Sequence, residues 1–256
     1  MLYLRVKVGC CGFPTAQERY YQSFPIVELQ STFYKLPRQS TVERWRETAP
    51  FGFEFVVKAW QIITHPSSSP TWKRAKLTVP EAKWSRYGCL RPTPENFGAL
   101  NRTLDVCKSL RARICLIQCP PSFQPVPQNV RNLKRFLTKI DRRGLTVAWE
   151  PRGNWLAKPQ LIRRLCNQLD LVHVVDLLRR DPASSVTFVY CRLHGLGDRE
   201  VNYTYRYTDN DLKQLAQKLS SVERQGCKEA YILFNNLTMF EDSKRFLKLL
   251  SEPGSG

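Results

Sequence analysis

The sequence lacks any apolar run long enough to span a membrane. Its first residues, MLYLRVKVGCCG, also lack the apolar segment of a secretory signal peptide. These absences argue against a membrane protein and predict a cytoplasmic location with no membrane partner. Residues 253–256, which end in Gly-Ser-Gly, are expected to form a flexible tail outside the folded domain.

Cysteines at metal-binding spacing are also missing. The nine cysteines are an odd number, and no two of them form a Cys-x-x-Cys pair. Cys115 and Cys119 lie four residues apart, which is not zinc-ribbon spacing. Most of the nine fall in apolar, strand-like runs, where a free thiol behaves as a small hydrophobic group. We therefore expect nine unlinked thiols and a reducing compartment.

Acidic residues are scarce. The chain has 22 Asp and Glu against 40 Lys and Arg, which gives a net charge of +18 and a pI of about 9.8. An excess of this size favours a polyanionic partner, with nucleic acid (DNA or RNA) ahead of an anionic membrane surface. The alternative is a generally basic protein without such a partner.

Short apolar runs recur along the whole chain and are separated by segments of helical period. The runs that we interpret as strands are Arg5–Cys11, Ile26–Tyr34, Phe53–Trp60, Arg113–Cys119, Leu145–Glu150, Leu171–Asp176, Val186–His194 and Glu229–Asn236. The segments that we interpret as helices are Thr41–Thr48, with Ser40 as its N-cap, then Pro94–Leu110, Val130–Ile140, Asn210–Arg224 and Glu241–Leu250.

Eight strands that alternate with helices over about 250 residues are typical of a (β/α)8 TIM-like barrel. An open, doubly wound sheet is the alternative, but no G-x-G-x-x-G motif follows the first strand. We predict one α/β barrel domain over residues 1–252. A long insertion rich in Ser, Pro, Trp, Lys and Arg follows the third strand at about residues 61–93, and we expect it to form a basic flap.

Polar residues stand at the ends of the predicted strands, where a barrel normally places Val, Ile and Leu. The candidate catalytic residues are Glu28, Lys58, Glu150, Asp176, Arg192 and His194. The candidate substrate-binding residues are Tyr34, Gln118, Arg152, Asn235 and Asn236, with His65 after the third strand. Ligand sites of barrels lie at this end of the strands, which favours a functional role. The alternative is that these groups only pair with one another, for example Glu150 with Arg192.

Three of these residues are carboxylates that could bind a divalent metal. Glu28, Glu150 and Asp176 offer oxygen ligands, and His194 offers one imidazole. Such a set suits Mg or Mn.

Several phrases, in this order along the chain, resemble those of the domain-of-unknown-function 72 family, the YecE-like proteins. They are Glu28-Leu-Gln-Ser-Thr-Phe-Tyr34, Phe53-Glu-Phe-Val-Val-Lys58, Ile63-Thr-His65, Gln118-Cys-Pro-Pro-Ser-Phe123, Glu150-Pro-Arg152 with Trp155, Phe188-Val-Tyr-Cys-Arg-Leu-His-Gly195 and Phe234-Asn-Asn236. The resemblance implies a TIM-like barrel with its site at these residues, and it adds Trp155 to the substrate-binding candidates. It implies no particular reaction.

The predicted flap is basic and carries aromatic residues among its cations. Its candidate contacts to a nucleic-acid backbone are Trp72, Lys73, Arg74, Lys76, Lys83 and Arg86. Cations neutralise phosphates and aromatic rings stack on bases. A second basic stretch, Arg131–Arg143, lies on a predicted amphipathic helix whose charged face could simply be solvated.

Together these features predict an endonuclease that cleaves phosphodiester bonds at the strand ends. In this hypothesis the carboxylates bind a metal or activate water, and Arg192 stabilises the phosphate charge that develops. Two alternatives are a non-catalytic nucleic-acid-binding protein and a barrel enzyme that acts on a small phosphorylated metabolite.

Overall fold

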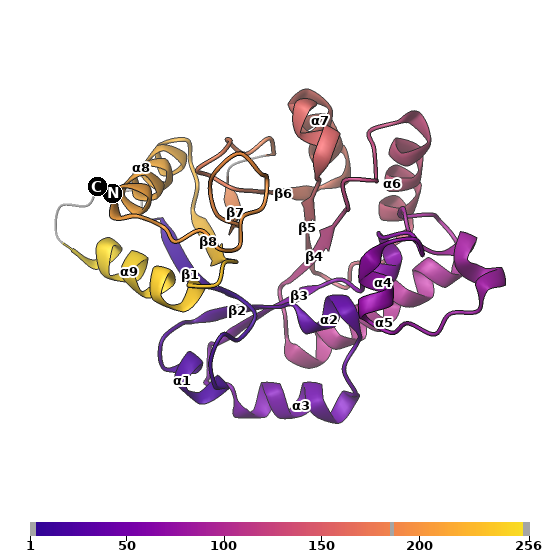
Figure 1. The fold of residues 1–256 in the computed structure, drawn as a ribbon, viewed down its shortest axis with the longest axis horizontal. Coiled ribbons are helices and arrows are strands. Elements are labelled where there is room, and N and C mark those ends of the chain that lie inside the picture. Colours follow the sequence, from indigo (N-terminus) through magenta and orange to yellow (C-terminus); the bar gives the residue numbers. More distant parts are fainter. Residues whose placement is uncertain (1–3, 185–186, 253–256) are drawn as a thin grey trace. The chain divides into compact units, whose positions relative to one another are not determined.

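The structure is a computed structural model that describes residues 4–184 and 187–252. Strands and helices alternate along the chain (Figure 1). The eight strands are hydrogen bonded in sequence order as a closed parallel barrel. The (β/α)8 prediction is therefore confirmed, and the open sheet is excluded.

The strands agree with the predicted runs in number and order. They are β1 Arg5–Cys11, β2 Ile26–Leu29, β3 Glu54–Lys58, β4 Ile114–Gln118, β5 Thr146–Glu150, β6 Leu171–Val175, β7 Phe188–Leu193 and β8 Glu229–Phe234. Only Arg5–Cys11 has the predicted bounds, and the other predicted runs extend past their strands at one or both ends. The Ile26–Tyr34 run ends its strand at Leu29, and Val186 lies outside the described residues.

The early end of β2 is set by hydrogen bonds of Thr32. Thr32 donates its hydroxyl to the carbonyls of Leu29 and Lys58, at 2.8 and 2.7 Å, and so turns the chain into a short helix, α2, at Ser31–Tyr34. Tyr34 is consequently a helical residue and not the last residue of a strand. The alternation of side chains along β2 therefore does not determine the direction of its ring.

Thr93 and Thr208 each cap an α-helix, and several other α-helices begin with a proline. The remaining α-helices are α1 Gln17–Tyr21, α3 Gln39–Thr48, α4 Pro70–Arg74, α5 Pro94–Leu110, α6 Pro127–Lys139, α7 Pro159–Leu169, α8 Asp209–Arg224 and α9 Met239–Ser251. Proline occupies the first turn of α5, α6 and α7, where its missing N–H costs nothing. Thr208 and Asp211 form a capping box at the start of α8. Ser40 is not an N-cap, because α3 begins one residue earlier, after Arg38.

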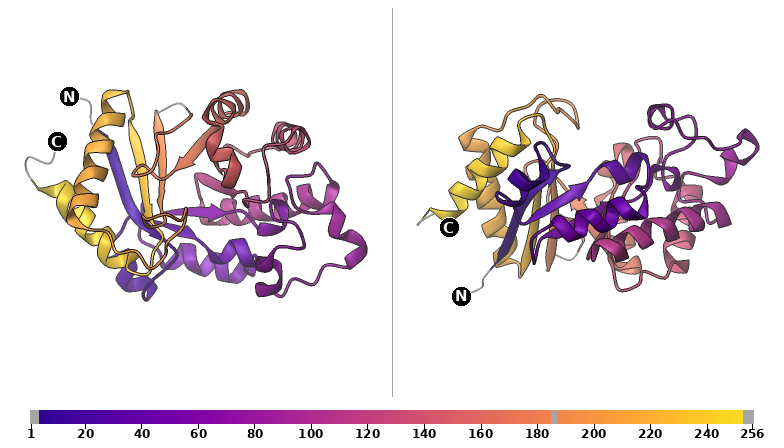
Figure 2. Two further views of the ribbon diagram at one scale, coloured as in Figure 1. Left: turned by 45° about the horizontal axis from the view of Figure 1, so that its top comes forward. Right: turned by 90° about the horizontal axis from the view of Figure 1, so that it is seen from below.

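The chain packs as two compact units. Unit 1 comprises Met1–Glu28, Pro50–Glu54 and Val172–Gly256, and unit 2 comprises Leu29–Ala49 and Phe55–Leu171. In unit 1, β1 pairs with β2 and β8, and β8 pairs with β7. Helix α9 packs on β1 and β8 and beside α8 (Figure 2). The core of this unit is apolar and closely packed, with Val8, Cys191 and Phe246 fully buried.

Unit 2 contains the β3, β4 and β5 ladder, against which α5 packs. Helix α3 lies beside α5, and Phe97 of α5 stacks on Phe136 of α6 with ring centroids 4.8 Å apart. These contacts fix the elements that carry the polar side chains at the ends of β3, β4 and β5.

Residues 61–93 are more ordered than a free flap. They contain two 3₁₀ turns, η1 Gln61–Ile63 and η2 Glu81–Arg86, with α4 between them. The amides of Gly88 and Leu90 donate to the carbonyls of Ile62 and Ile63, at 2.7 and 2.9 Å, so the segment folds back on itself. Trp72 is only 5% exposed, which contradicts its predicted place on the surface. Its ring N–H donates to the carbonyl of His65 and anchors α4.

All nine cysteines are free, and all except the partly buried Cys89 are buried. Burial raises the pKa of Cys119 to about 12, and hydrogen bonding with burial raises that of Cys107. We therefore expect thiol titration of denatured, non-reduced protein to detect close to nine thiols. A substantial shortfall without added oxidant would contradict the prediction that the cysteines are unlinked.

Among the residues that the structure describes, no helix is both long and apolar enough to cross a membrane.

Candidate functional site

The polar residues at the strand ends of unit 1 include a fully buried network around Glu28. Its carboxylate accepts the hydroxyl of Tyr190 at 2.6 Å and the guanidinium of Arg192 at 2.9 Å. The side chains of Glu28 and Arg192 are 0% and 1% exposed. Burial and the adjacent carboxylate raise the pKa of Tyr190 well above its ordinary value, so the phenol stays protonated.

The Glu28 network explains why a cation lies inside a barrel strand. The opposite charges compensate each other in a place where an isolated charge would be costly. The shared face of Tyr190 and Arg192, predicted from strand alternation, is confirmed by their common partner. The guanidinium of Arg192 is 1% exposed and contacts Glu28. The predicted contact between Arg192 and a phosphate therefore has no support.

Asp176 follows β6 directly and is the carboxylate best suited to proton transfer. It is 6% exposed, its Oδ1 accepts the amide of Leu178 at 3.0 Å, and its Oδ2 lies 3.7 Å from Nε of Arg179. Burial raises the pKa of Asp176 to about 6, against the lowering effect of Leu178, Arg179 and Arg180. A carboxyl group with this pKa can both take up and release a proton near neutral pH.

The loops that follow β7 and β8 carry the other predicted residues of unit 1. His194 is 5% exposed, and its carbonyl accepts the amide of Asn202 at 2.8 Å. Asn236 is buried and donates its side-chain amide to the Tyr205 carbonyl and to Asp242, both at 2.7 Å. Asn235 is partly buried. Asn236 therefore positions the loops and is not exposed for binding.

In unit 2, Lys58 at the end of β3 lies close to a histidine. Lys58 is 5% exposed, donates to Oε1 of Gln30 at 3.2 Å and lies 4.2 Å from the ring centroid of Phe33. Burial, followed by the positive charges of Lys58 and Arg152, lowers the pKa of His65 to about 3. The imidazole is consequently neutral at physiological pH, beside two buried cations.

Glu150, the last residue of β5, forms an ion pair with Arg152 at 2.6 Å. Within unit 2 the carboxylate of Glu150 contacts Arg152, and within unit 1 the guanidinium of Arg192 contacts Glu28. The Glu150–Arg192 pair that the sequence suggested stays a prediction. Glu150 and Arg152 are 6% and 7% exposed. Gln118 stands opposite Glu150 in the β4–β5 ladder and is partly buried.

Trp155 belongs to the core of unit 2. Its ring is fully buried, its N–H donates to the Phe123 carbonyl, and it packs edge-on against Trp149 with centroids 5.1 Å apart. The substrate contact that the family resemblance implied is therefore replaced by a packing role.

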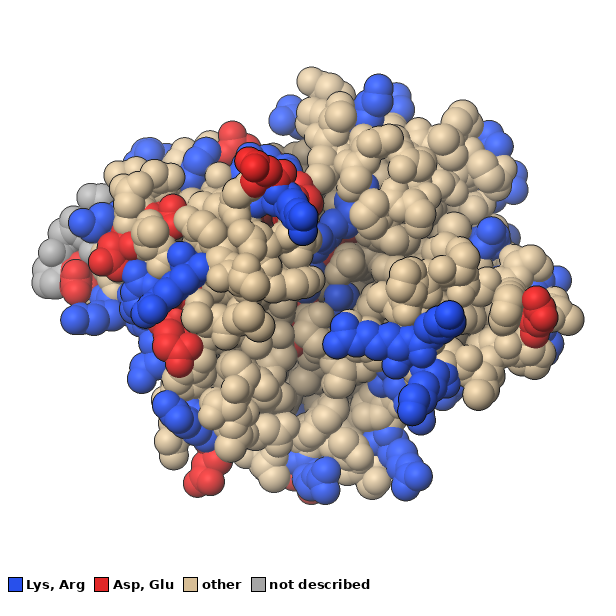
Figure 3. Space-filling model, in the orientation of Figure 1, with Lys and Arg blue, Asp and Glu red and all other residues tan. Residues whose placement is uncertain are grey.

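Of the six residues predicted to contact a nucleic-acid backbone, all except Trp72 are exposed. The exposed residues are Lys73, Arg74, Lys76, Lys83 and Arg86. Arg74 lies over the ring of Tyr34 at 5.3 Å, and Arg86 pairs with Glu95 at 3.1 Å. On the face shown in Figure 3, Lys and Arg side chains gather over α2 and α4.

The predicted metal set is not assembled. In residues 4–184 and 187–252, no three or more His, Cys, Asp or Glu side chains are grouped so that they could hold a metal ion. Glu28 and Glu150 each contact an arginine instead. The prediction of a Mg or Mn site at Glu28, Glu150 and Asp176 is thus not supported.

Sequence reasoning missed two arginines that organise unit 1. Arg179 donates to the carbonyls of Gly195 and Arg199, at 2.7 and 2.8 Å, and Arg180 forms two hydrogen bonds with Glu200, at 2.8 and 2.9 Å. Both hold the loop after β7 to the segment after β6. The available signal was their position three and four residues after Asp176.

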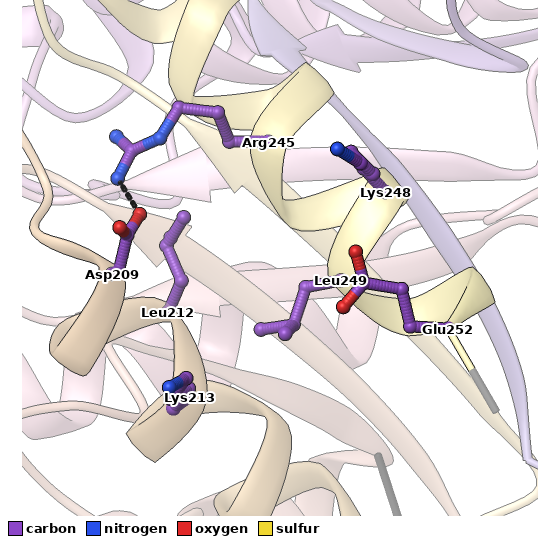
Figure 4. A pocket seen from close by; sticks show the side chains of 7 residues that line it. All are labelled: Asp209, Leu212, Lys213, Arg245, Lys248, Leu249 and Glu252. Carbon is purple, nitrogen blue, oxygen red and sulfur yellow. Dashed lines mark hydrogen bonds and ion pairs between the residues drawn. The ribbon is translucent and has the colours of Figure 1, made fainter. Parts of the chain in front are cut away.

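A separate surface pocket of about 320 Å³ lies between α8 and α9 (Figure 4). Its lining residues are Asp209, Leu212, Lys213, Arg245, Lys248, Leu249 and Glu252. Arg245 contacts Asp209 and Asp242, so part of the positive charge is neutralised within the protein. None of the residues predicted from the sequence lines this pocket.

The eight-stranded barrel agrees with the protein family to which this chain is similar. A family model described as a protein of unknown function, DUF72, matches residues 14–254. The chain belongs to the DUF72 family. The UPF0759 protein YunF of Bacillus subtilis (strain 168) is 26% identical, over 93% of this chain and 88% of that protein.

Solved structures of this family share the fold. A DUF72 family protein from Enterococcus faecalis V583 aligns with a TM-score of 0.73 at 19% identity, over 98% of this chain and 100% of the other. One from Thermotoga maritima MSB8 aligns with a TM-score of 0.70 at 23% identity, over 97% and 100%.

More distant solved structures share the barrel fold. A D-tagatose 3-epimerase-like protein aligns with a TM-score of 0.57 at 13% identity, over 94% of this chain and 96% of the other. Endonuclease IV from Thermus thermophilus aligns with a TM-score of 0.50 at 12% identity, over 94% and 99%. At these identities the likeness shows the barrel fold and no activity.

Proposed function

We propose that this protein binds nucleic acid and hydrolyses phosphodiester bonds at the carboxyl ends of its barrel strands. The observation that carries the proposal is the exposed basic segment of unit 2. Between residues 73 and 86 five cations are exposed, and Glu81 is the only acidic residue. Such a surface attracts phosphates through counterion release.

Each unit, taken by itself, contains groups of the kind that hydrolysis uses. In unit 2, Lys58 and Arg152 provide positive charge beside neutral His65, an environment that stabilises a phosphate. In unit 1, Asp176 has a pKa of about 6 and acts as the proton acceptor for an attacking water. Endonuclease IV from Thermus thermophilus, which shares the barrel fold, acts on nucleic acid, and its fold is compatible with such chemistry.

The direct test is incubation of purified protein with labelled DNA and RNA, with and without EDTA. Cleavage of either polymer supports the proposal, and the EDTA samples reveal a need for a divalent metal. Binding without cleavage under every condition would leave a nucleic-acid-binding protein. Neither binding nor cleavage would contradict the proposal as a whole.

Charge reversal of Lys73, Arg74 and Lys76 to Glu is expected to abolish most nucleic-acid binding. Binding by the parent should also weaken by roughly 10³–10⁵ between 50 and 200 mM salt if six to ten phosphates are contacted. A gel shift across this salt range measures both effects. The fold should persist, because all three side chains are exposed.

The matched control reverses Lys158, Arg163 and Arg164, which are also exposed, at the start of α7 and within it. The control changes the net charge equally and should weaken binding far less. Equal loss in both triple variants would mean that net charge, and not the 73–86 segment, drives binding.

A small phosphorylated metabolite is a second candidate substrate. It is favoured by the burial of Lys58, because a buried cation suits a single compact anion. Protection of the protein against thermal unfolding by sugar phosphates, with no effect of nucleic acid, would favour this candidate.

A further inference from the structure

Two residues with large exposed side chains lie next to each other in the loops after β7 and β8 of unit 1. Tyr203 is 50% exposed and Leu237 is 75% exposed. The amide of Leu237 donates to the carbonyl of Tyr203 at 2.7 Å, so the two residues are neighbours although they are 34 positions apart. The ring of Tyr203 lies 6.4 Å from the ring of His194, centroid to centroid.

The turn that carries Tyr203 is rigid. Asn202 donates its amide to the His194 carbonyl at 2.8 Å and its side chain to the Leu196 carbonyl at 2.9 Å. Gly195 has a φ of +83°, and a Cβ there would lie 2.0 Å from the Asn202 carbonyl oxygen. Only glycine allows this close approach, which places Tyr203 at the tip of the turn.

The turn that carries Leu237 is tied to the same structure. Asn236 binds the Tyr205 carbonyl and the carboxylate of Asp242, which is 0% exposed. The loops after β7 and β8 are thereby joined at Asn236 and Leu237. The exposed side chains of Tyr203 and Leu237 consequently belong to turns that are fixed by hydrogen bonds.

A single exposed leucine needs no explanation, because protein surfaces contain many apolar atoms. Two large side chains from different loops, side by side on rigid turns at the strand ends, are a different case. Apolar side chains that nucleic-acid-binding proteins insert between bases unstack the base step and kink the strand. The net charge of +18 favours a polyanion as the occupant of this surface.

We propose that Tyr203 and Leu237 form a wedge that inserts between neighbouring bases of a bound nucleic acid and unstacks them. The inference rests on the proposed function and defines its substrate class as a strand whose bases are separated at the site. Lys and Arg side chains then supply affinity, and the wedge opens the base step beside His194.

The test uses DNA that contains 2-aminopurine, whose fluorescence rises when the base is unstacked. The parent protein at saturation should raise the fluorescence several-fold in both duplex and single-stranded DNA. The Tyr203→Ala/Leu237→Ala double variant should lose the rise and about tenfold in affinity, the scale of one stacking contact. Its melting temperature should match that of the parent, because both side chains are exposed.

Phe51→Ala is the matched control. Phe51 is fully exposed and also belongs to unit 1, but it precedes β3, on a loop hydrogen bonded to the start of β2. This variant should behave like the parent. If it too loses the fluorescence rise, the effect does not come from the wedge.

The remaining outcomes separate the two proposals. If the parent binds DNA but leaves 2-aminopurine stacked, the wedge is wrong and the proposed function stands. If the parent binds no nucleic acid, both are wrong. If the double variant unstacks bases normally but changes from oligomer to monomer in sedimentation, the pair belongs to an interface between protein copies.

Discussion

Glu150→Gln is expected to lower the melting temperature by roughly 6–20 °C. The change removes the charge that compensates Arg152 and leaves a buried cation, which typically costs about 3–5 kcal/mol. Both side chains are less than 10% exposed, so solvent screens the pair little. Glutamine keeps the size of the side chain and one hydrogen-bond acceptor, so the loss reports on charge and not on packing.

Glu95→Gln is the matched control, because Glu95 pairs with Arg86 at the surface. Exposed ion pairs contribute little to stability, so this variant should melt close to the parent. The cleavage assay is run on the same samples. A Glu150→Gln variant that melts like the parent but no longer cleaves would contradict the structural role and assign Glu150 to the chemical step. A variant that melts and cleaves like the parent would contradict both roles.

Local signals in the sequence were sufficient for most of the fold. Arg5–Cys11 and Pro94–Leu110 have the bounds that were predicted. The first is an apolar run with strand propensity, and the second begins with a proline and continues with a helical period. The Ile26–Tyr34 run was extended too far because its end is set by a contact between Thr32 and Lys58, which lie 26 residues apart. No local pattern reports such a contact.

The partners of the charged residues were less predictable than their positions. Glu150 and Arg152 are two residues apart, and period-two alternation could have suggested that they share a face. Glu28 and Arg192 are 164 residues apart and meet only in the folded barrel. The burial of Trp72 and Trp155 could not be predicted from the sequence either. An aromatic residue among cations or near a strand end is as typical of a binding site as of a core.

Asp176→Asn is expected to reduce cleavage by about 100-fold or more and, in the same protein, to raise stability at neutral pH. A carboxyl group that must be charged in a buried place destabilises the fold, and a neutral amide does not. The folded-state pKa of Asp176 is about 6, above its ordinary value of 3.8. Loss of activity with a gain in stability is the result that a merely structural carboxylate would not give.

The raised pKa of Asp176 determines how the stability of the protein depends on pH. Between about pH 4 and pH 6 the folded protein binds more protons than the unfolded chain, so the contribution of Asp176 to stability falls by about 3 kcal/mol as the pH rises through this window. In Asp176→Asn this fall should disappear. The activity of the parent should rise with pH through about 6 if the charged carboxylate accepts the proton.

Asp211→Asn, in the same unit, serves as the control, because the pKa of Asp211 is lowered and the expected change in stability is opposite to that of Asp176→Asn. Burial alone would raise the pKa of Asp211, but hydrogen bonds from Tyr205 and Thr208 lower it. Its stabilising contribution is therefore present above the unfolded-state pKa and is lost as the pH falls, so Asp211→Asn should destabilise the protein at neutral pH and leave the pH profile of cleavage unchanged. Urea unfolding and cleavage rates from pH 4 to pH 8 measure both variants. An Asp176→Asn variant with normal cleavage would remove Asp176 from the chemical step, whatever its stability.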